Sequence, residues 1–192
     1  MEAEMEIRLL HEDEILRATI LSKDVFDELV RNYMQNKKME ECFDGYVSEE
    51  KLKEAVRMGQ LFVWGAYDGE NLMGVSAMQL DGHITMLYVD RIYQGRKVAK
   101  ALLDTMKEYA GRVLKIETVS INAMPAWSSS YFKRNGFWIL GNIDVQHASF
   151  VPMMANSSCY VKEKETDDSV LVGIICLIAF FIYCILAFLC LK

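Results

Sequence analysis

Hydrophobic and polar residues along the first sixty positions predict one strand followed by helices. Residues 4–10, "EMEIRLL", alternate apolar and polar side chains, as a half-buried strand does. Residues 11–34 place apolar side chains at helical spacing, which predicts one or two helices. Residues 46–59, "YVSEEKLKEAVRMG", predict a further helix, with Ser48 as its N-cap and Gly59 as its C-terminal stop.

The middle of the chain changes to the pattern of a β-sheet. Three strand-like runs, "LFVWGAY", "LMGVSAMQL" and "HITMLYV", are separated by the turn sequences "DGEN" and "DG". Asp-Gly between alternating runs is a strong signal for a β-hairpin. Residues 61–89 are therefore predicted to form an antiparallel meander.

Helices and strands then alternate up to the last strand. A helix is expected to begin near Gln94, and Gly111 is expected to end it. A strand over residues 115–121, a short helix over residues 126–135 and a last strand near residues 148–154 follow. This order of elements predicts an α+β or mixed α/β fold.

The end of the chain carries a long apolar run. Residues 170–191 are 22 residues without a charge, and as a helix they would extend about 33 Å, enough to cross a bilayer. Core helices are rarely this long and apolar on every face. We therefore predict a domain over residues 1–156, a polar linker over residues 157–169 and a transmembrane helix over residues 170–191. Because this anchor would leave the ribosome last, we expect a single-pass membrane protein with its domain in the cytoplasm.

Charge and cysteine content narrow the partners. The net charge of −6 argues against nucleic acid as a partner. Of the five cysteines, three lie in the predicted anchor, and Cys42 and Cys159 match no metal-binding spacing. We expect free thiols in a reducing compartment and no metal site.

The loop of residues 94–99, "QGRKVA", joins a predicted strand to a predicted helix. The first N–H groups of a helix have no partner within it, and the helix dipole favours negative charge there. Gly95 permits close approach of a ligand, and Arg96 and Lys97 add positive charge. These features suit a pyrophosphate, although an ordinary helix start with solvated basic residues has the same pattern.

Segments of the chain resemble the GNAT acetyltransferase superfamily. The loop "QGRKVA" is similar to the family's Gln/Arg-x-x-Gly-x-Gly/Ala signature, with matches at Gln94 and Ala99 and with Lys97 in place of the middle glycine. "HITMLYVDRIYQG", "SINAMPAWSSSYFKRNGF" and "FVPMM" resemble other family segments and stand in the family's order. The resemblance covers roughly residues 5–154. It implies a mixed, mostly antiparallel central sheet flanked by helices.

The resemblance also implies acetyl-coenzyme A as the cofactor. In the family two strands splay apart, here residues 83–89 and 115–122, and the pantetheine arm lies between them. Asn122 would then lie near the thiol arm, although a strand-end turn residue explains it equally well. The residues implied to bind the cofactor are Leu87, Tyr88, Val89, Gln94, Gly95, Arg96, Lys97, Val98, Ala99, Asn122 and Phe132.

Lys97 is the main departure from the family's loop. If its backbone required a positive φ, a lysine there would cost about 1 kcal/mol or more. Because Gly95 supplies flexibility nearby, we expect Lys97 to have ordinary helical backbone, with its ammonium free to contact phosphate.

The acid that protonates the leaving thiolate is a second departure. In the family this is often the tyrosine of "FYxxxGF", and counting back from Gly136 places Phe132 at that position. Tyr131 comes one residue earlier, which rotates a helical side chain by about 100°. Water, Ser129 or a shifted Tyr131 remain as substitutes.

The general base has two candidates, and neither is strongly supported. His83 begins a predicted strand and is neutral near pH 7, but it also fits a surface residue after a turn. Glu117 lies in a predicted strand and faces either the cleft or solvent. The catalytic candidates are therefore Tyr131, His83 and Glu117. Trp64, Trp127 and Trp138 are expected in the core or the cleft wall rather than in a substrate cage.

Taken with the anchor, the resemblance implies an acetyl-coenzyme A-dependent N-acetyltransferase that acts on a primary amine, small molecule or protein, at the cytoplasmic face of a membrane. The alternative is a catalytically weak acetyl-coenzyme A sensor or interaction module anchored in the membrane. Phe132 and Lys97 favour this alternative, because both depart from the family's pattern.

Overall fold

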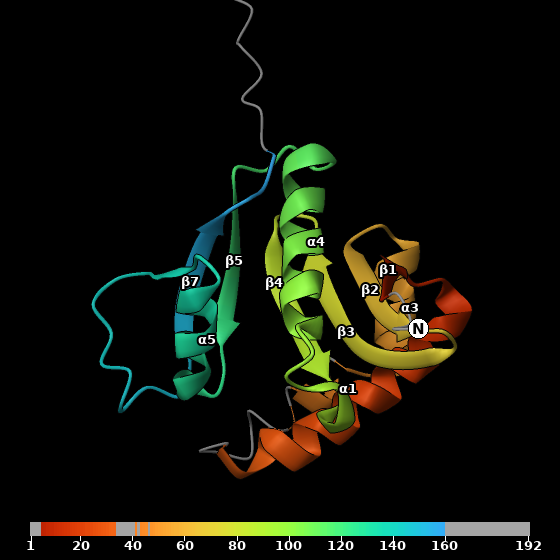
Figure 1. Ribbon diagram of the computed structural model, residues 1–192, viewed down its shortest axis with the longest axis horizontal. Coiled ribbons are helices and arrows are strands. Elements are labelled where there is room, and N and C mark those ends of the chain that lie inside the picture. The colour runs from red at the N-terminus through yellow and green to blue at the C-terminus, as the bar shows by residue number, and fades with distance from the viewer. Residues whose placement is uncertain (1–4, 34–40, 42, 46, 160–192) are drawn as a thin grey trace, which may run out of the picture. The chain divides into compact units, whose positions relative to one another are not determined.

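A computed structural model describes residues 5–33, 41, 43–45 and 47–159 (Figure 1). Within these residues, seven strands form one sheet in the order β1-β2-β3-β4-β5-β7-β6. The strands are β1 (Glu6–Leu9), β2 (Leu61–Asp68), β3 (Asn71–Gln79), β4 (His83–Val89), β5 (Thr118–Ala123), β6 (Trp138–Ile139) and β7 (Val151–Asn156). Only β4 and β5 pair in parallel, and the other neighbours are antiparallel. The predicted mixed, mostly antiparallel sheet is confirmed.

Helices cover both faces of the sheet. The described α-helices are α1 (Ile15–Leu29), α3 (Glu49–Arg57), α4 (Val98–Arg112) and α5 (Ser129–Arg134), with 3₁₀ turns η1 (Glu12–Glu14), η2 (Arg31–Tyr33), η3 (Arg91–Tyr93) and η4 (Ala126–Ser128). Two hydrophobic clusters hold these layers. Phe26 of α1 and Leu52 of α3 pack with Val63 of β2, whereas Leu102 of α4 packs with Trp64. Since successive strand residues face opposite sides, the adjacent positions 63 and 64 belong to different cores.

The predicted meander is confirmed. β2, β3 and β4 pair as successive antiparallel hairpins. Gly69 and Gly82 have positive φ in the two turns, a conformation that glycine adopts without strain. The helix at α3 also matches its prediction: the Ser48 side chain accepts a hydrogen bond from the Lys51 N–H, and Gly59 follows the helix with a φ of 67°.

Both predicted boundaries of the helix after the meander are wrong. α4 begins at Val98 rather than near Gln94, because Gly95 (φ 80°) and Lys97 (φ 65°) have left-handed backbone that no α-helix contains. The expectation of ordinary helical backbone at Lys97 is therefore wrong as well. α4 continues through Gly111, which is buried, and ends at Arg112.

The later strands begin further along the chain than predicted. Lys115 has a φ of 58°, so β5 starts only at Thr118, and the last strand covers Val151–Asn156. The predicted linker is described only as far as Cys159, and the predicted anchor over residues 170–191 lies outside the described residues. None of the helices in the described part of the chain has the length and hydrophobicity that a membrane crossing requires.

Candidate active site

The parallel strands β4 and β5 separate soon after they begin. His83 pairs with Ser120 and Ile84 with Ile121, and beyond these residues β4 keeps only β3 as a described strand partner. A strand edge without a partner exposes backbone N–H and C=O groups. The C-terminal half of β4 therefore offers hydrogen-bonding groups on the side that faces away from β3.

A cleft of about 650 Å³ lies at this open edge. Its volume is in the range of small-molecule and cofactor sites. Residues of β4, the loop before α4, α5 and the C-terminal end of α1 line it. The predicted site residues in its wall are Leu87, Tyr88, Val89, Gln94, Gly95, Lys97, Val98, Ala99, Tyr131 and Phe132.

The loop before α4 and the first turn of α4 line this cleft, and the first turn has backbone N–H groups without helical acceptors. The Gln94 side chain donates to the Val89 carbonyl at 3.2 Å and ties the loop to the end of β4. The first backbone bond of α4 runs from the Ala101 N–H to the Lys97 carbonyl, so the N–H groups just before Ala101 have no helical acceptor. A Cβ at Gly95 would meet nothing within 4 Å. With Gly95 and Lys97 left-handed, the loop has a backbone conformation that can accommodate an anion at a helix N-terminus.

Among the described residues that line the cleft, every charged side chain is basic. These side chains are Lys97, Lys100 and Arg134. Lys100 also forms an ion pair with Asp104 on the next turn of α4. Arg96 does not line the cleft; its guanidinium lies over the Tyr93 ring, 5.4 Å from the ring centroid. A cleft lined by these basic side chains and by the N-terminus of a helix fits a polyphosphate.

α5 contributes an aromatic wall with an unpartnered hydroxyl. Phe132 is 7% exposed and packs against Phe137, with ring centroids 5.6 Å apart. Tyr131 also lines the cleft, and its buried Oη has no hydrogen-bond partner among the described residues. Burial raises the pKa of Tyr131 above its ordinary value of 10.0, so the phenol is protonated at neutral pH. Ser129 is buried and does not line the cleft, whereas its neighbour Ser128 lines the cleft and has a buried Oγ without a described partner.

The remaining predicted residues lie away from the cleft. His83 Nδ1 is 2.8 Å from Ser120 Oγ at the start of β4, and the cleft wall begins four residues later, about 13 Å along the strand. Glu117 is exposed just before β5, and its carbonyl accepts a hydrogen bond from the Ser157 N–H at 2.9 Å. Asn122 is exposed on β5. The catalytic or binding roles of these three residues stay predictions.

Some cleft residues were not predicted as site residues. They come from α1 and its C-terminal end (Val25, Leu29 and Val30), from α4 (Lys100) and from α5 (Arg134). The α1 residues gave only the signal of an apolar helix face, and which cavity that face borders depends on tertiary packing. Of the tryptophans, Trp64 is in the core and Trp127 lines the cleft, as expected, while Trp138 is 42% exposed on β6.

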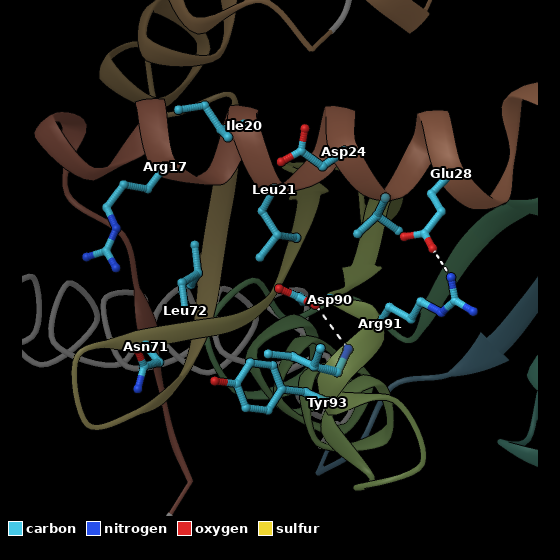
Figure 2. Close-up of a pocket in the computed structure, with 12 residues that line it drawn as sticks. Arg17, Ile20, Leu21, Asp24, Glu28, Asn71, Leu72, Asp90, Arg91 and Tyr93 are labelled. Atoms are coloured by element: carbon cyan, nitrogen blue, oxygen red, sulfur yellow. Dashed lines mark hydrogen bonds and ion pairs between the residues drawn. The ribbon is translucent and has the colours of Figure 1, made fainter.

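A second cavity of about 440 Å³, the groove, lies between α1 and η3 (Figure 2). It shares Val25 and Tyr93 with the cleft. Figure 2 shows Arg17, Ile20, Asp24 and Glu28 on α1 opposite Asn71, Leu72, Asp90 and Tyr93. Of the five charged groups in its described wall, all except the exposed Asp24 bond to one another or to backbone. Glu28 pairs with Arg91, the Asp90 carboxylate accepts from the Ile92 N–H at 3.0 Å, and Arg17 donates to the Glu70 carbonyl at 2.9 Å.

Comparison with known proteins identifies the family. The family model described as "Acetyltransferase (GNAT) domain" matches residues 23–156. No curated protein sequence gives a significant match.

Solved structures share the fold. The PaiA N-acetyltransferase of Thermoplasma acidophilum, in complex with coenzyme A, is 17% identical with a TM-score of 0.63, over 80% of this chain and 99% of that one. A GCN5-related N-acetyltransferase from Rhodopseudomonas palustris is 18% identical with a TM-score of 0.66, over 81% and 98%. The spermidine N-acetyltransferase of Vibrio cholerae, in complex with coenzyme A and spermine, is 13% identical with a TM-score of 0.56, over 82% and 98%. The family match covers more than half of the chain. The chain therefore belongs to the GNAT acetyltransferase family, as an N-acetyltransferase that uses acetyl-coenzyme A.

Proposed function

We propose that the protein transfers the acetyl group of acetyl-coenzyme A to a primary amine within the cleft, close to the cytoplasmic face of a membrane. One observation carries the catalytic part of this proposal. Elements that line the cleft have polar groups that the fold leaves without described partners, namely the first N–H groups of α4 and the buried Tyr131 hydroxyl. Unsatisfied polar groups destabilise a fold unless something binds to them.

The residues of the cleft fit the cofactor's parts in order. The N–H groups at the start of α4 and the Lys97 ammonium would hold the pyrophosphate. Lys100 and Arg134 would add positive charge for the remaining phosphate. The open edge of β4, from Leu87 to Val89, would bond to the amides of the pantetheine arm.

The chain's own groups supply the proton and the electrostatic stabilisation for the transfer. When bound, acetyl-coenzyme A supplies the acetyl thioester. The backbone N–H of Val89, which faces away from β3, would donate to the oxyanion that develops on the thioester carbonyl. Tyr131 would donate a proton to the departing sulfur, which its raised pKa allows throughout the neutral range. Among the described lining residues none has a carboxylate or imidazole, so water would accept the amine's proton.

Acetyl-coenzyme A binding and turnover by the full chain in detergent micelles test this function. Calorimetry measures cofactor binding, and thiol release is followed over a panel of primary amines. Binding with amine-dependent release supports the transferase. Binding without release on any amine would favour the weak sensor, which Phe132 at the family's tyrosine position motivates. An absence of binding at millimolar cofactor would overturn the proposal.

The membrane part of the proposal rests on the uncharged run of residues 170–191. A single lysine near the centre of a transmembrane helix costs about 2.5–3.5 kcal/mol of insertion free energy. We therefore expect the full chain to stay with membranes during alkaline carbonate extraction, and the double variant Ile178→Lys and Ile182→Lys to be released. Release of the unmodified chain would rule out the anchor without affecting the catalytic proposal.

A further inference from the structure

An exposed pair of aromatic rings stands beside the cleft, and we call it the aromatic rim. Tyr33 of η2 and Trp127 of η4 meet edge to face, with ring centroids 5.8 Å apart and planes at 69°. They are 57% and 59% exposed, although both side chains are large and mostly apolar. Trp127 also belongs to the cleft wall. Exposed aromatic groups of this kind are typical of binding surfaces, because they give a large contact area at a low cost in conformational entropy.

The cleft wall next to Trp127 is apolar. Val25, Leu29 and Val30 line the cleft from α1 and its C-terminal end, and Met124 and Pro125 line it from the segment before η4. This part of the wall is distinct from the loop and helix start that present N–H groups and cations. The cleft therefore has one region suited to phosphates and another suited to a hydrophobic group.

The charges of the cleft restrict what an acceptor can carry. Lys97, Lys100 and Arg134 are the charged residues in the described wall, and no carboxylate accompanies them. Because the phosphates of the cofactor would pair with these three cations, the described wall has no carboxylate that could pair with the several ammonium groups of a polyamine. An amine with an otherwise uncharged body needs no such counter-charge.

We infer that the acceptor is a primary amine joined to an apolar, preferably aromatic, body, and that the aromatic rim holds this body while the amino group enters the cleft. The inference rests on the proposed acetyl transfer. Desolvation by the apolar wall disfavours the ammonium form, so the acceptor binds as the neutral, nucleophilic amine. This accounts for a cleft whose described wall lacks a carboxylate or imidazole base.

The transfer balances with the groups already named. The amine lone pair forms the new N–C bond and the C–S bond of the thioester breaks. The sulfur takes a proton from Tyr131, the amine nitrogen releases one proton to water, and Tyr131 regains one from water. The products are an N-substituted acetamide and the coenzyme A thiol.

The first test measures kcat/KM of the full chain, in detergent micelles, for three different acceptors. Phenethylamine represents the small apolar amines, a short peptide with an N-terminal phenylalanine represents the same chemistry on a polypeptide, and spermidine represents the polycations. We expect kcat/KM to be at least about tenfold higher for phenethylamine, for the peptide or for both than for spermidine. Whichever of the two apolar acceptors is preferred then shows whether the natural acceptor is a small molecule or a protein. Preference for spermidine would overturn the inference.

The second test replaces the aromatic rim. Trp127→Ala and Tyr33→Ala should each raise the KM for the preferred apolar acceptor about tenfold. Trp138→Ala is the matched control, because Trp138 is also exposed but lies on β6 outside the cleft wall. Equal effects of Trp127→Ala and Trp138→Ala would overturn the inference.

A variant that adds a carboxylate to the cleft tests the inference even if the alanine variants fold poorly. Leu29 is half-buried at the last turn of α1 and lines the cleft, so Leu29→Glu adds the missing carboxylate. We expect the ratio of kcat/KM for spermidine to that for phenethylamine to rise at least about tenfold, and an unchanged ratio would contradict the charge argument. If none of the tested amines gave thiol release, the proposed function itself would fail. That result is distinguishable from turnover with the wrong class of amine.

Discussion

The cleft and the groove are neighbouring cavities that differ in whether the polar groups of their lining residues have bonding partners. Val25 of α1 and Tyr93 of η3 line both cavities. In the groove, Glu28 pairs with Arg91, and Arg17 and Asp90 bond to backbone groups. Of the residues that line the cleft, Ser128 and Tyr131 have buried hydroxyls without a described partner, and the first N–H groups of α4 lack helical acceptors.

This difference shows how a binding site can be recognised without a bound ligand. Polar groups that bond to one another stabilise the fold, and nothing further is required of them. Polar groups left unbonded in a cavity lower stability, so their presence together indicates that a ligand completes them. The groove is therefore interpreted as packing between α1 and the β4–α4 connection, and the cleft as the site.

Removing the Tyr131 hydroxyl should have the largest effect and would test the cleft directly. Tyr131→Phe should lower kcat about 100-fold, because general acid catalysis contributes roughly 10²–10⁴-fold. The KM for acetyl-coenzyme A should change little. Because the pKa of Tyr131 lies above 10.0, wild-type kcat should not lose this acid until the pH exceeds 10.

Tyr109→Phe is the matched control for this prediction. Tyr109 packs against Trp64 and Phe62 on the hydrophobic face of α4, away from the cleft wall, and burial raises its pKa too. Stopped-flow or steady-state thiol release should give near wild-type kcat for this variant. If Tyr131→Phe and Tyr109→Phe had equal kcat, the unpartnered hydroxyl would have no catalytic role.

The next largest effect is expected on stability, at the hydrogen-bonded charge pair of Arg8 and Glu14. Arg8 donates to Glu14 at 2.7 Å and the Tyr67 hydroxyl donates to the same carboxylate at 3.1 Å, which fixes the start of α1 against β1 and β2. The Arg8 guanidinium lowers the pKa of Glu14 to about 2. The Glu14 side chain is 17% exposed and Arg8 more so, which reduces the contribution by solvent screening. We expect Glu14→Gln to lose about 1–2 kcal/mol of unfolding free energy at pH 7.

The pH dependence of this loss has a defined sign. A carboxylate whose pKa is lowered in the folded state stabilises the protein above its unfolded pKa, near 4.5, and this stabilisation is lost as the pH falls toward 2. Urea denaturation at pH 7 and pH 3 should therefore show a smaller difference between Glu14→Gln and wild type at pH 3. Asp13→Asn, an exposed neighbour, is the control. A pH-independent difference would contradict the charge-based explanation.

Lys97 lines the cleft, and replacing it should change both stability and cofactor binding. Its φ of 65° is strained for a lysine, so Lys97→Gly should raise the unfolding free energy by about 1 kcal/mol and Tm by roughly 2–4 °C. The same change removes the ammonium and should weaken acetyl-coenzyme A binding several-fold. Lys97→Ala keeps the strain and removes the charge, so only binding should fall. Calorimetry and thermal denaturation separate these effects, and equal Tm values for the two variants would contradict the strain.

The sequence predicted what depends on neighbours in the chain. Asp-Gly turns and period-two alternation are local signals, and they located the meander and its turns. The boundaries of α4 were missed because apolar periodicity does not report backbone φ at Gly95 and Lys97. Gly111 was taken as a stop, but it is buried on the face of α4, where a small residue suits close packing.

The candidate site was predictable only in part, for the same reason. The loop of residues 94–99 and the α5 aromatics are contiguous segments, so a resemblance to a family could indicate them. The α1 part of the wall, with Leu29 and Val30, reaches the cleft only through tertiary packing. His83 has the right chemistry for a base, but its position at the paired end of β4, bonded to Ser120, follows from strand register.

The smallest effect is expected in the groove, where Glu28 and Arg91 form an exposed ion pair. Pairs of this kind contribute less than about 1 kcal/mol, because water and salt screen them. Glu28→Gln should therefore change the unfolding free energy only slightly at low salt and not at 1 M NaCl, and kcat and both KM values should stay at wild type. Steady-state kinetics beside urea denaturation at the two salt concentrations measures all of these. A large fall in kcat/KM would mean that the groove takes part in binding, since no loss of stability this small could produce it, and the distinction between satisfied and unsatisfied cavities would then fail for this protein.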